Sequence, residues 1–186
     1  MPGNFIDPMR KLILYIAASI DNYIARPDGD VEWLNAAELR LPGEDYGYAD
    51  FYQAVDTTLM GNRTYQVIQG FDVPFPYPDK TNYVFTRSDI RAGNSDVTFV
   101  AGDVAAFVRT LKEKPGRDIW LIGGGQINTL LLEQGLIDRI ILTLIPVLLG
   151  EGIPLFHGKH AETSFNAVSG RMYDNGVVKW IIDPVN

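Results

Sequence analysis

The feature that most constrains this chain is an apolar stretch, 119–122, which runs into three consecutive glycines and then directly into a helical pattern that reaches Leu131. An apolar strand followed at once by an amphipathic helix is typical of a parallel α/β sheet. The glycines leave bare backbone N–H groups at the positive end of the helix dipole, which suits an anionic group such as a pyrophosphate. The alternative is a tight turn that needs glycine only for a positive φ angle, although one glycine normally satisfies such a turn.

Composition limits the class of protein. The chain has 186 residues, of which 46% are hydrophobic, so we expect one globular domain over 1–186 that needs no disulfide. The absence of cysteine excludes a disulfide framework and a thiolate nucleophile and fits a reducing cytoplasm, where we expect the protein to act. A net charge of -7 argues against a nucleic-acid partner. The short apolar runs and the N-terminal sequence predict neither a membrane span nor a secretory signal.

Apolar runs and helical spacings alternate along the chain. The runs predict strands at 11–17, 57–61, 82–86, 97–100, 119–123 and 137–144. Helical spacing predicts helices at 48–55, 62–69 and 104–112, and a further helix after the glycines. Asn175-Gly176 is the preferred pair for a tight primed turn and predicts a C-terminal hairpin. We therefore predict an α/β fold whose sheet is parallel in its middle, with an antiparallel hairpin at one edge and helices on both faces.

Four motifs along the chain carry a resemblance to a known family. They are KLILYIAASIDNYIA (11–25), TLMGNRTYQVI (58–68), NYVFTRS (82–88) and IWLIGGGQINTLLLEQGLIDRIILTLIPVLLGEGIPLF (119–156). In this order and spacing the chain resembles the dihydrofolate-reductase-like superfamily. It is most similar to the branch that contains the reductase domain of the bifunctional riboflavin-biosynthesis deaminase-reductase. The resemblance implies a three-layer dihydrofolate-reductase-like fold, NADPH as the cofactor and a homodimer.

The resemblance assigns the first cofactor-binding turn to the residues after the second motif's strand. Gly61, Asn62, Arg63 and Thr64 match the turn in which helix amides, a hydroxyl and a basic side chain hold the NADPH phosphates. From the sequence alone, this segment is equally an ordinary helix start with an arginine that faces solvent.

The third motif matches a loop beside the adenosine ribose. Thr86, Arg87 and Ser88 occupy it, and the resemblance implies that Arg87 pairs with a 2′-phosphate and so favours NADPH over NADH. An exposed arginine after a strand is also unremarkable, so both interpretations stay open.

The triple glycine matches the family's second cofactor-binding turn. There Gly123, Gly124 and Gly125 lie beneath the nicotinamide and the pyrophosphate, and the family has a cis peptide between the first two glycines. The resemblance implies that the amides of Gln126 and Ile127 face the pyrophosphate. The next residue, Asn128, is expected on the helix surface.

The remaining expectations concern the nicotinamide and the substrate. Ala17 and Ile24 match positions that hold the nicotinamide carboxamide, while Trp33 and Phe51 are either walls for a flat heterocycle or core aromatics. Asn22 stands where the riboflavin-type reductases have glycine in SLDG, a departure that puts the same phosphosugar substrate in doubt. This position is a candidate substrate contact.

Reduction of a C=N bond also needs a proton donor, which a carboxyl group or an ordered water can supply. Among the acids of the 38–50 region, Glu38, Glu44, Asp45 and Asp50, we favour Asp50, with Asp21 as a second candidate. Either acid could instead be solvated. The two histidines, His157 and His160, lack partner ligands in the sequence, and we expect no metal site.

We therefore expect an NADPH-dependent reductase that transfers a hydride to a small heterocycle or to a ribosylamino-pyrimidine. The alternative within enzymes is dihydrofolate reduction. An alternative of another class is a dimer of the same fold that binds a nucleotide without catalysis.

Overall fold

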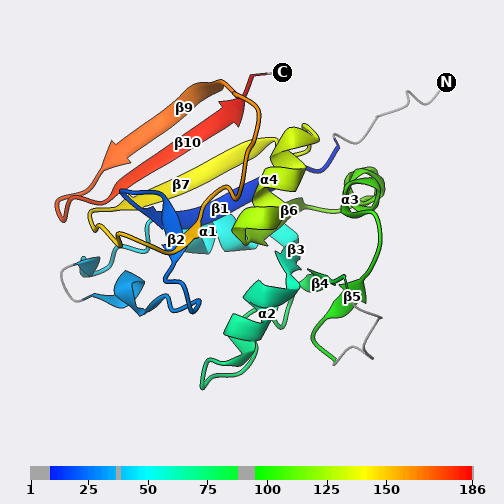
Figure 1. Ribbon diagram of the computed structural model, residues 1–186, viewed down its shortest axis with the longest axis horizontal. Coiled ribbons are helices and arrows are strands. Elements are labelled where there is room, and N and C mark those ends of the chain that lie inside the picture. Colours follow the sequence, from blue (N-terminus) through cyan, green and yellow to red (C-terminus); the bar gives the residue numbers. More distant parts are fainter. Residues whose placement is uncertain (1–8, 37–38, 88–94, 186) are drawn as a thin grey trace.

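A mainly parallel β-sheet forms the centre of the molecule (Figure 1). The computed structural model describes residues 9–36, 39–87 and 95–185. The strands are β1 (Leu12–Ser19), β2 (Tyr23–Ala25), β3 (Val55–Gly61), β4 (Thr81–Phe85), β5 (Thr98–Val100), β6 (Asp118–Gly123), β7 (Arg139–Ile145), β8 (Ile153–Pro154), β9 (Phe165–Met172) and β10 (Val178–Pro184). Eight of them form one sheet in the order β5-β4-β3-β6-β1-β7-β10-β9, and β2 pairs with β8. From β5 to β7 the neighbours are parallel, whereas β10 is antiparallel to β7 and β9, which confirms the predicted sheet.

Helices cover both faces of this sheet. They are α1 (Tyr48–Ala54), α2 (Asn62–Gln69), α3 (Val104–Lys112) and α4 (Gly125–Glu133), with a short 3-10 turn at Glu32–Asn35. Alternate residues of β1 point to opposite faces: Leu12 and Leu14 join the cluster that contains α3 and α4, whereas Ile13 and Tyr15 join that of α1. The predicted α/β class with helices on both faces is therefore confirmed. No helix in the described part of the chain is long and apolar enough to cross a bilayer.

Buried polar contacts join the amino-terminal ends of the parallel strands. The guanidinium of Arg10, which is 5% exposed, contacts the Asp56 carboxylate and donates to Thr57 Oγ1 over 2.7 Å. The Lys112 ammonium lies 2.6 Å from Asp138 Oδ2, and the same carboxylate oxygen accepts from the Leu12 amide. These contacts tie the start of β1 to β3 and to the residues before β7.

The C-terminal hairpin forms as predicted at one edge of the sheet, but the predicted two-residue primed turn is wrong. Tyr173 N–H donates to the Val177 carbonyl over 2.9 Å, so three residues lie in the loop. Gly176 has a φ of 81°, whereas Asn175 is not among the described residues with a positive φ. A three-residue loop needs the left-handed conformation only once, and glycine supplies it.

The proline-rich segment 71–80 is mostly exposed, but Lys80 at its end is buried, with its ammonium over the Tyr52 ring. Two short strands are missing from the sequence-based prediction. They are β2 and β8, which lie in the connections after β1 and β7 and pair with each other. Strands this short lack a periodic signal, because their pairing depends on a partner far along the chain.

The Arg10 contacts yield a stability prediction. Arg10→Met removes the cation and leaves the Asp56 carboxylate without its ion pair, so we expect the free energy of unfolding to fall by about 2–3 kcal/mol. Urea denaturation measures this change. The matched control is Arg26→Met, which breaks an exposed pair with Asp30 and should cost less than about 0.5 kcal/mol. Equal losses in the two variants would contradict the assignment.

Candidate functional site

The direction of chain connections reverses between β3 and β6. From β3 the chain passes through α2 to β4 on one side, whereas from β6 it passes through α4 to β7 on the other side. The two strands are parallel neighbours, with Met60 in register with Gly123, so both helices start at the same edge of the sheet. In Figure 1 they begin beside the ends of β3 and β6 and run away from each other. Open α/β sheets bind ligands in the crevice at such a switch point.

The first turns of α2 and α4 lack side-chain caps. Gly61 and Gly124 are the N-cap residues, and neither helix start has a capping side-chain hydrogen bond. The contrast is α3, where the Asp103 carboxylate accepts from the Ala106 amide over 3.0 Å. Helix geometry leaves the first amides of a helix without partners inside the helix. The two uncapped helix starts therefore present donors toward one crevice.

The two glycine turns meet across a narrow gap. A Cβ atom built on Gly124 would lie 3.3 Å from Thr64 Oγ1 and 3.8 Å from Ile24 Cδ1, and one built on Gly61 would lie 3.9 Å from the Gly123 carbonyl oxygen. The side chain that Gly124 lacks would therefore point between Thr64 and Ile24. The peptide between Gly123 and Gly124 is cis, as the resemblance implies, and Gly123 has a φ of 113°.

The third glycine, Gly125, is required for a different reason. A Cβ atom on Gly125 would lie 2.3 Å from the Pro154 carbonyl oxygen, so close packing against β8 excludes any larger residue. Within the first turn of α4, the Ile127 amide donates to the Gly124 carbonyl over 3.0 Å. The expectation that this amide faces an anion stays a prediction, and the amides of Gly125 and Gln126 precede it in the same turn.

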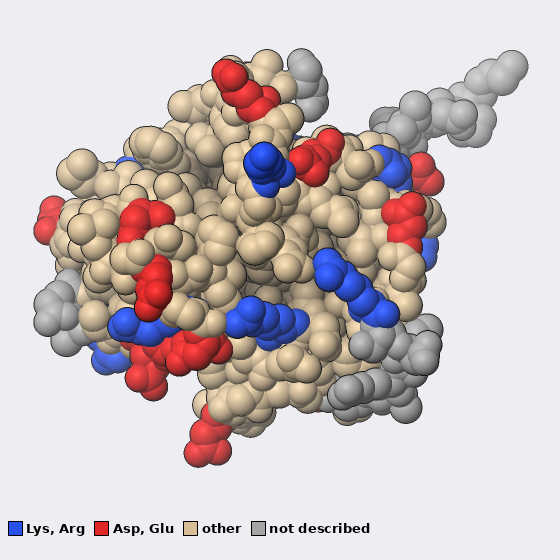
Figure 2. All heavy atoms as spheres, in the orientation of Figure 1, with Lys and Arg blue, Asp and Glu red and all other residues tan. Residues whose placement is uncertain are grey.

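Two arginines flank the crevice. The guanidinium of Arg63 donates to the Pro27 carbonyl over 2.8 Å, and that of Arg87 donates to Gln126 Oε1 over 3.2 Å. Arg87 thus bridges from the end of β4 to the start of α4. Figure 2, in the orientation of Figure 1, shows basic side chains on both sides of the surface beside the start of α2. Thr86 donates its amide to Val100, and Ser88 lies outside the described residues.

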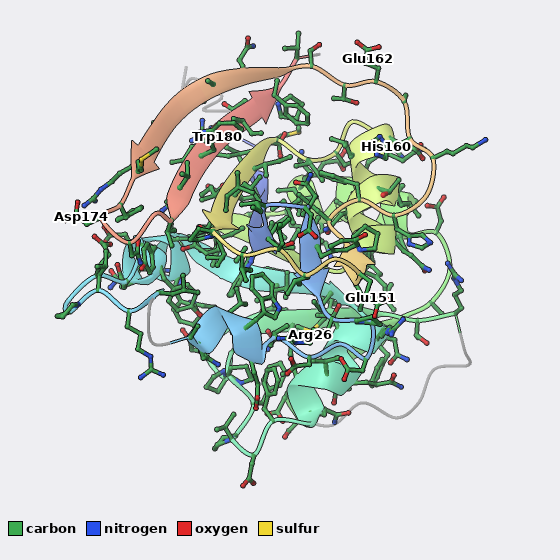
Figure 3. The ribbon with its side chains drawn as sticks, turned by 60° about the vertical axis from the view of Figure 1, so that its left-hand side comes forward. Arg26, Glu151, His160, Glu162, Asp174 and Trp180 are labelled. Atoms are coloured by element: carbon green, nitrogen blue, oxygen red, sulfur yellow. The ribbon has the colours of Figure 1, made fainter. Side chains whose placement is uncertain are left out.

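A hollow of about 330 Å³ adjoins this side of the crevice. It lies between the 26–28 loop and the segment 149–151, and Figure 3 labels Arg26 and Glu151 on these two loops. Its wall includes Pro27, to which Arg63 is bonded. A larger hollow, of about 510 Å³, lies at the other end of α4 among residues 132–137, 162–164 and 184–185.

The two residues expected at the nicotinamide, Ala17 and Ile24, lie in different surroundings. Ala17 is half-buried near the end of β1, in register with Thr143, and packs against the cluster around Trp33. Ile24, in β2, packs against the cluster that includes α4. The structure thus brings Ile24 to Gly124, while Ala17 lies on the sheet face that also carries α1.

The turn after β1 contains two of the predicted site residues, Asp21 and Asn22. The Asp21 carboxylate accepts from Ser19 Oγ over 2.5 Å and from the amides of Leu149 and Gly150 over 3.2 and 2.8 Å. The Ser19 hydroxyl above all, together with these amides, lowers the pKa of Asp21. Asn22 has a φ of 64°, a left-handed conformation that asparagine tolerates better than most residues. The backbone at this position therefore favours asparagine or glycine, and the role of Asn22 as a substrate contact stays a prediction.

The acids of the 38–50 region take separate places. Asp45 accepts from the amides of Ala49 and Gly47, first-turn contacts that lower its pKa. Glu44 accepts from the Tyr46 amide and pairs with an exposed arginine of β9. Asp50 is exposed in the first turn of α1. Glu38 lies outside the described residues.

Trp33 and Phe51 serve as core aromatics. Phe51 stacks on Tyr15 with ring centroids 4.2 Å apart and meets the Trp120 ring edge-on. Trp33 is buried beside Ile145, and its indole N–H has no hydrogen-bond partner among the described residues. Their second predicted role, as walls of a substrate site, stays a prediction.

Asn128 is a residue whose place the sequence did not reveal. We expected it on the helix surface, which is wrong: its side chain is fully buried, and Nδ2 donates to the Leu155 carbonyl over 2.9 Å. A polar residue in a helical pattern normally marks the exposed face, so the signal pointed outward. Its partner lies 27 residues further along the chain.

Comparisons with known proteins agree with this geometry. Residues 77–179 match the model of the RibD C-terminal domain family. The protein YwjB of Bacillus subtilis (strain 168) is 42% identical over 169 residues, which cover 90% of this chain and 95% of YwjB. A crystal structure from Shewanella sp. PV-4, of a protein named for riboflavin biosynthesis, superimposes with a TM-score of 0.84 at 27% identity, covering 95% of this chain and 99% of that one.

A more distant structure has the same fold. Dihydrofolate reductase from Enterococcus faecalis, complexed with NADP(H), gives a TM-score of 0.68 at 15% identity and covers 95% of this chain and 97% of that one. The family model spans more than half of this chain, and the relative from B. subtilis spans nearly all of it. The chain therefore belongs to the RibD C-terminal domain family and has the dihydrofolate-reductase-like fold.

Proposed function

We propose that this protein is an NADPH-dependent reductase that passes a hydride to a small heterocycle or a ribosylamino-pyrimidine, such as 5-amino-6-(5-phosphoribosylamino)uracil. The observation that carries the proposal is the meeting of two uncapped helix starts across Gly124, at the switch point of the sheet. Membership of the RibD C-terminal domain family supports the reductase class, and the riboflavin-biosynthesis name of a relative supports the substrate class.

Because Gly124 has no side chain, a dinucleotide can approach the backbone of this turn, where a Cβ atom would lie only 3.3 Å from Thr64 Oγ1. In the proposal the amides of Gly125 and Gln126, with those of the first turn of α2, bind the diphosphate. When bound, the nicotinamide supplies the hydride. Ala17 and Ile24 orient its ring and exclude water. Gly61, Asn62, Thr64 and Arg63 hold the phosphates on the other side.

The two predicted acids differ in what their surroundings allow. A lowered pKa and three hydrogen bonds keep Asp21 ionised and fixed, which suits positioning of the 149–150 loop and not proton donation. Asp50 lies on the helix that covers the same sheet face as Ala17. Asp50, or a water at its side, is therefore the proposed proton source, and Asn22 and the Trp33 region are proposed to border the substrate.

We also infer a homodimer, with an interface that includes the exposed face of β10. The apolar segment 140–142 of β7 is buried inside the sheet. The outer strands β9 and β10 expose Val168, Met172 and Trp180, the last 48% exposed and labelled in Figure 3. Apolar side chains gathered on two adjacent strands are typical of a protein interface. A mass of one protomer at micromolar concentration would contradict the dimer.

Gly124→Ala tests the cofactor site. The methyl group would enter the gap between Thr64 and Ile24, so we expect the Kd for NADPH to rise about tenfold or more, with little loss of stability. Titration of NADPH fluorescence measures the Kd. Gly70→Ala is the matched control, since its Cβ atom would also lie 3.3 Å from its nearest neighbour, the Val67 carbonyl, but at the far end of α2. Equal affinity of both variants for NADPH would refute the site.

Arg87→Gln tests the preference for NADPH. Because Arg87 is proposed to pair with the 2′-phosphate, its loss should raise the Kd for NADPH about tenfold and leave the Kd for NADH nearly unchanged. Arg109→Gln is the matched control, because Arg109 makes the same type of contact, to Gln134 at the other end of α4, over 2.8 Å. A parallel rise for both cofactors would argue against 2′-phosphate recognition.

Turnover separates the leading function from its alternatives. Purified protein and NADPH are mixed with 5-amino-6-(5-phosphoribosylamino)uracil, and separately with dihydrofolate, and NADPH absorbance is followed. We expect oxidation with the pyrimidine. Oxidation with dihydrofolate alone favours the second enzyme hypothesis, and NADPH binding without oxidation by either acceptor favours the non-catalytic nucleotide-binding dimer.

A further inference from the structure

Asn128, the fourth residue of α4, places a fully buried side-chain amide behind the glycine turn, and no cofactor contact is assigned to it. Buried polar groups in folded proteins almost always have hydrogen-bond partners, so a buried amide on a helix needs a structural reason. The neighbouring Thr129 has one: its hydroxyl donates to the Gly125 carbonyl and accepts from the His157 amide over 2.8 Å. The partners of Asn128 lie elsewhere.

The Asn128 amide lies against Gly123 and is bonded to Leu155. A Cβ atom on Gly123 would lie 3.2 Å from Asn128 Oδ1 and 3.5 Å from Nδ2, and Nδ2 donates to the Leu155 carbonyl over 2.9 Å. Oδ1 has no hydrogen-bond partner among the described residues. The opposite orientation of the amide would set two carbonyl oxygens against each other, so the Leu155 carbonyl fixes the orientation of the amide. Asn128 thus fills the space behind the triple-glycine turn.

Leu155 also links Asn128 to the turn that precedes β2. Its amide donates to the Asn22 carbonyl over 2.9 Å, and the preceding residues of β8 pair with β2. One peptide segment is therefore bonded both to Asn128, behind the glycine turn, and to the turn that leads into Ile24. Ile24 is one of the two residues nearest to the position of the missing Gly124 side chain, and Thr64 is the other.

We propose that Asn128 is a positioning residue that sets the separation between the glycine turn and the strand carrying Ile24, and thereby the width of the dinucleotide crevice. The proposal rests on the function proposed above. Ile24 Cδ1 lies only 3.8 Å from the position of the absent Gly124 side chain, so a small displacement of β2 changes the fit of a flat ring. Asn128 acts through Gly123 and Leu155 and does not touch the ligand.

The test compares Asn128→Leu with Thr129→Val. Both remove a buried hydrogen-bonding group from the same turn of α4 and keep its size, but only Asn128 contacts Gly123 and Leu155. We expect the Kd for NADPH to rise about tenfold in the first variant and to stay within about twofold of the wild type in the second. The emission maximum of bound NADPH should shift only in the first, because the ring environment changes. Equal effects of the two variants, or none, would overturn the proposal.

Amide hydrogen exchange of the protein without ligand gives a second readout. A peptide covering 19–25 should exchange about fivefold faster in Asn128→Leu than in the wild type or in Thr129→Val. Serine at this position is too short to reach both Gly123 and Leu155, so Asn128→Ser should show the same faster exchange. This variant serves as the test if Asn128→Leu does not fold. If wild-type protein fails to bind NADPH, the proposed function falls, while unchanged exchange at 19–25 is what overturns the role of Asn128.

Discussion

The parallel pairing of β3 with β6 is the constraint on which the rest of the structure depends. It sets Met60 beside Gly123 and therefore brings two glycine turns, far apart in sequence, to one edge of the sheet. Because the chain leaves these strands in opposite directions, α2 and α4 cover opposite faces and neither fills the gap between their starts. The crevice is a consequence of topology, and the glycines keep it open.

The two ends of the parallel strands differ: contacts that stabilise the sheet lie at the amino-terminal ends, and the proposed binding site lies at the carboxyl ends. At the amino-terminal edge, the buried cations of Arg10 and Lys112 pair with the partly exposed carboxylates of Asp56 and Asp138, and these contacts join neighbouring strands. At the carboxyl edge the helix starts lack side-chain caps, and Gly124 has no side chain to cover its backbone. The helix starts at the crevice can therefore leave amide donors uncapped, because contacts at the opposite edge and the apolar core hold the strands together.

Local patterns predicted the strands, the helices and the glycine turn, because each of these is encoded within about a dozen residues. What the sequence could not supply were contacts between distant segments. Gly125 is glycine because of Pro154, and Asn128 is buried because of Leu155, yet neither partner is visible from the helix pattern itself. The primed turn at Asn175 failed because a single left-handed residue, Gly176, closes that loop. The left-handed conformation of Asn22 was likewise not evident from the sequence.

The central claim is that both glycine turns bind one dinucleotide, and a crystal structure of the protein with NADP+ tests it most directly. The account predicts the diphosphate between the first turns of α2 and α4, within hydrogen-bond distance of the Gly125 or Gln126 amide, with the nicotinamide beside Ile24. A dinucleotide bound at another place, or one that touches only one of the two helix starts, would contradict it.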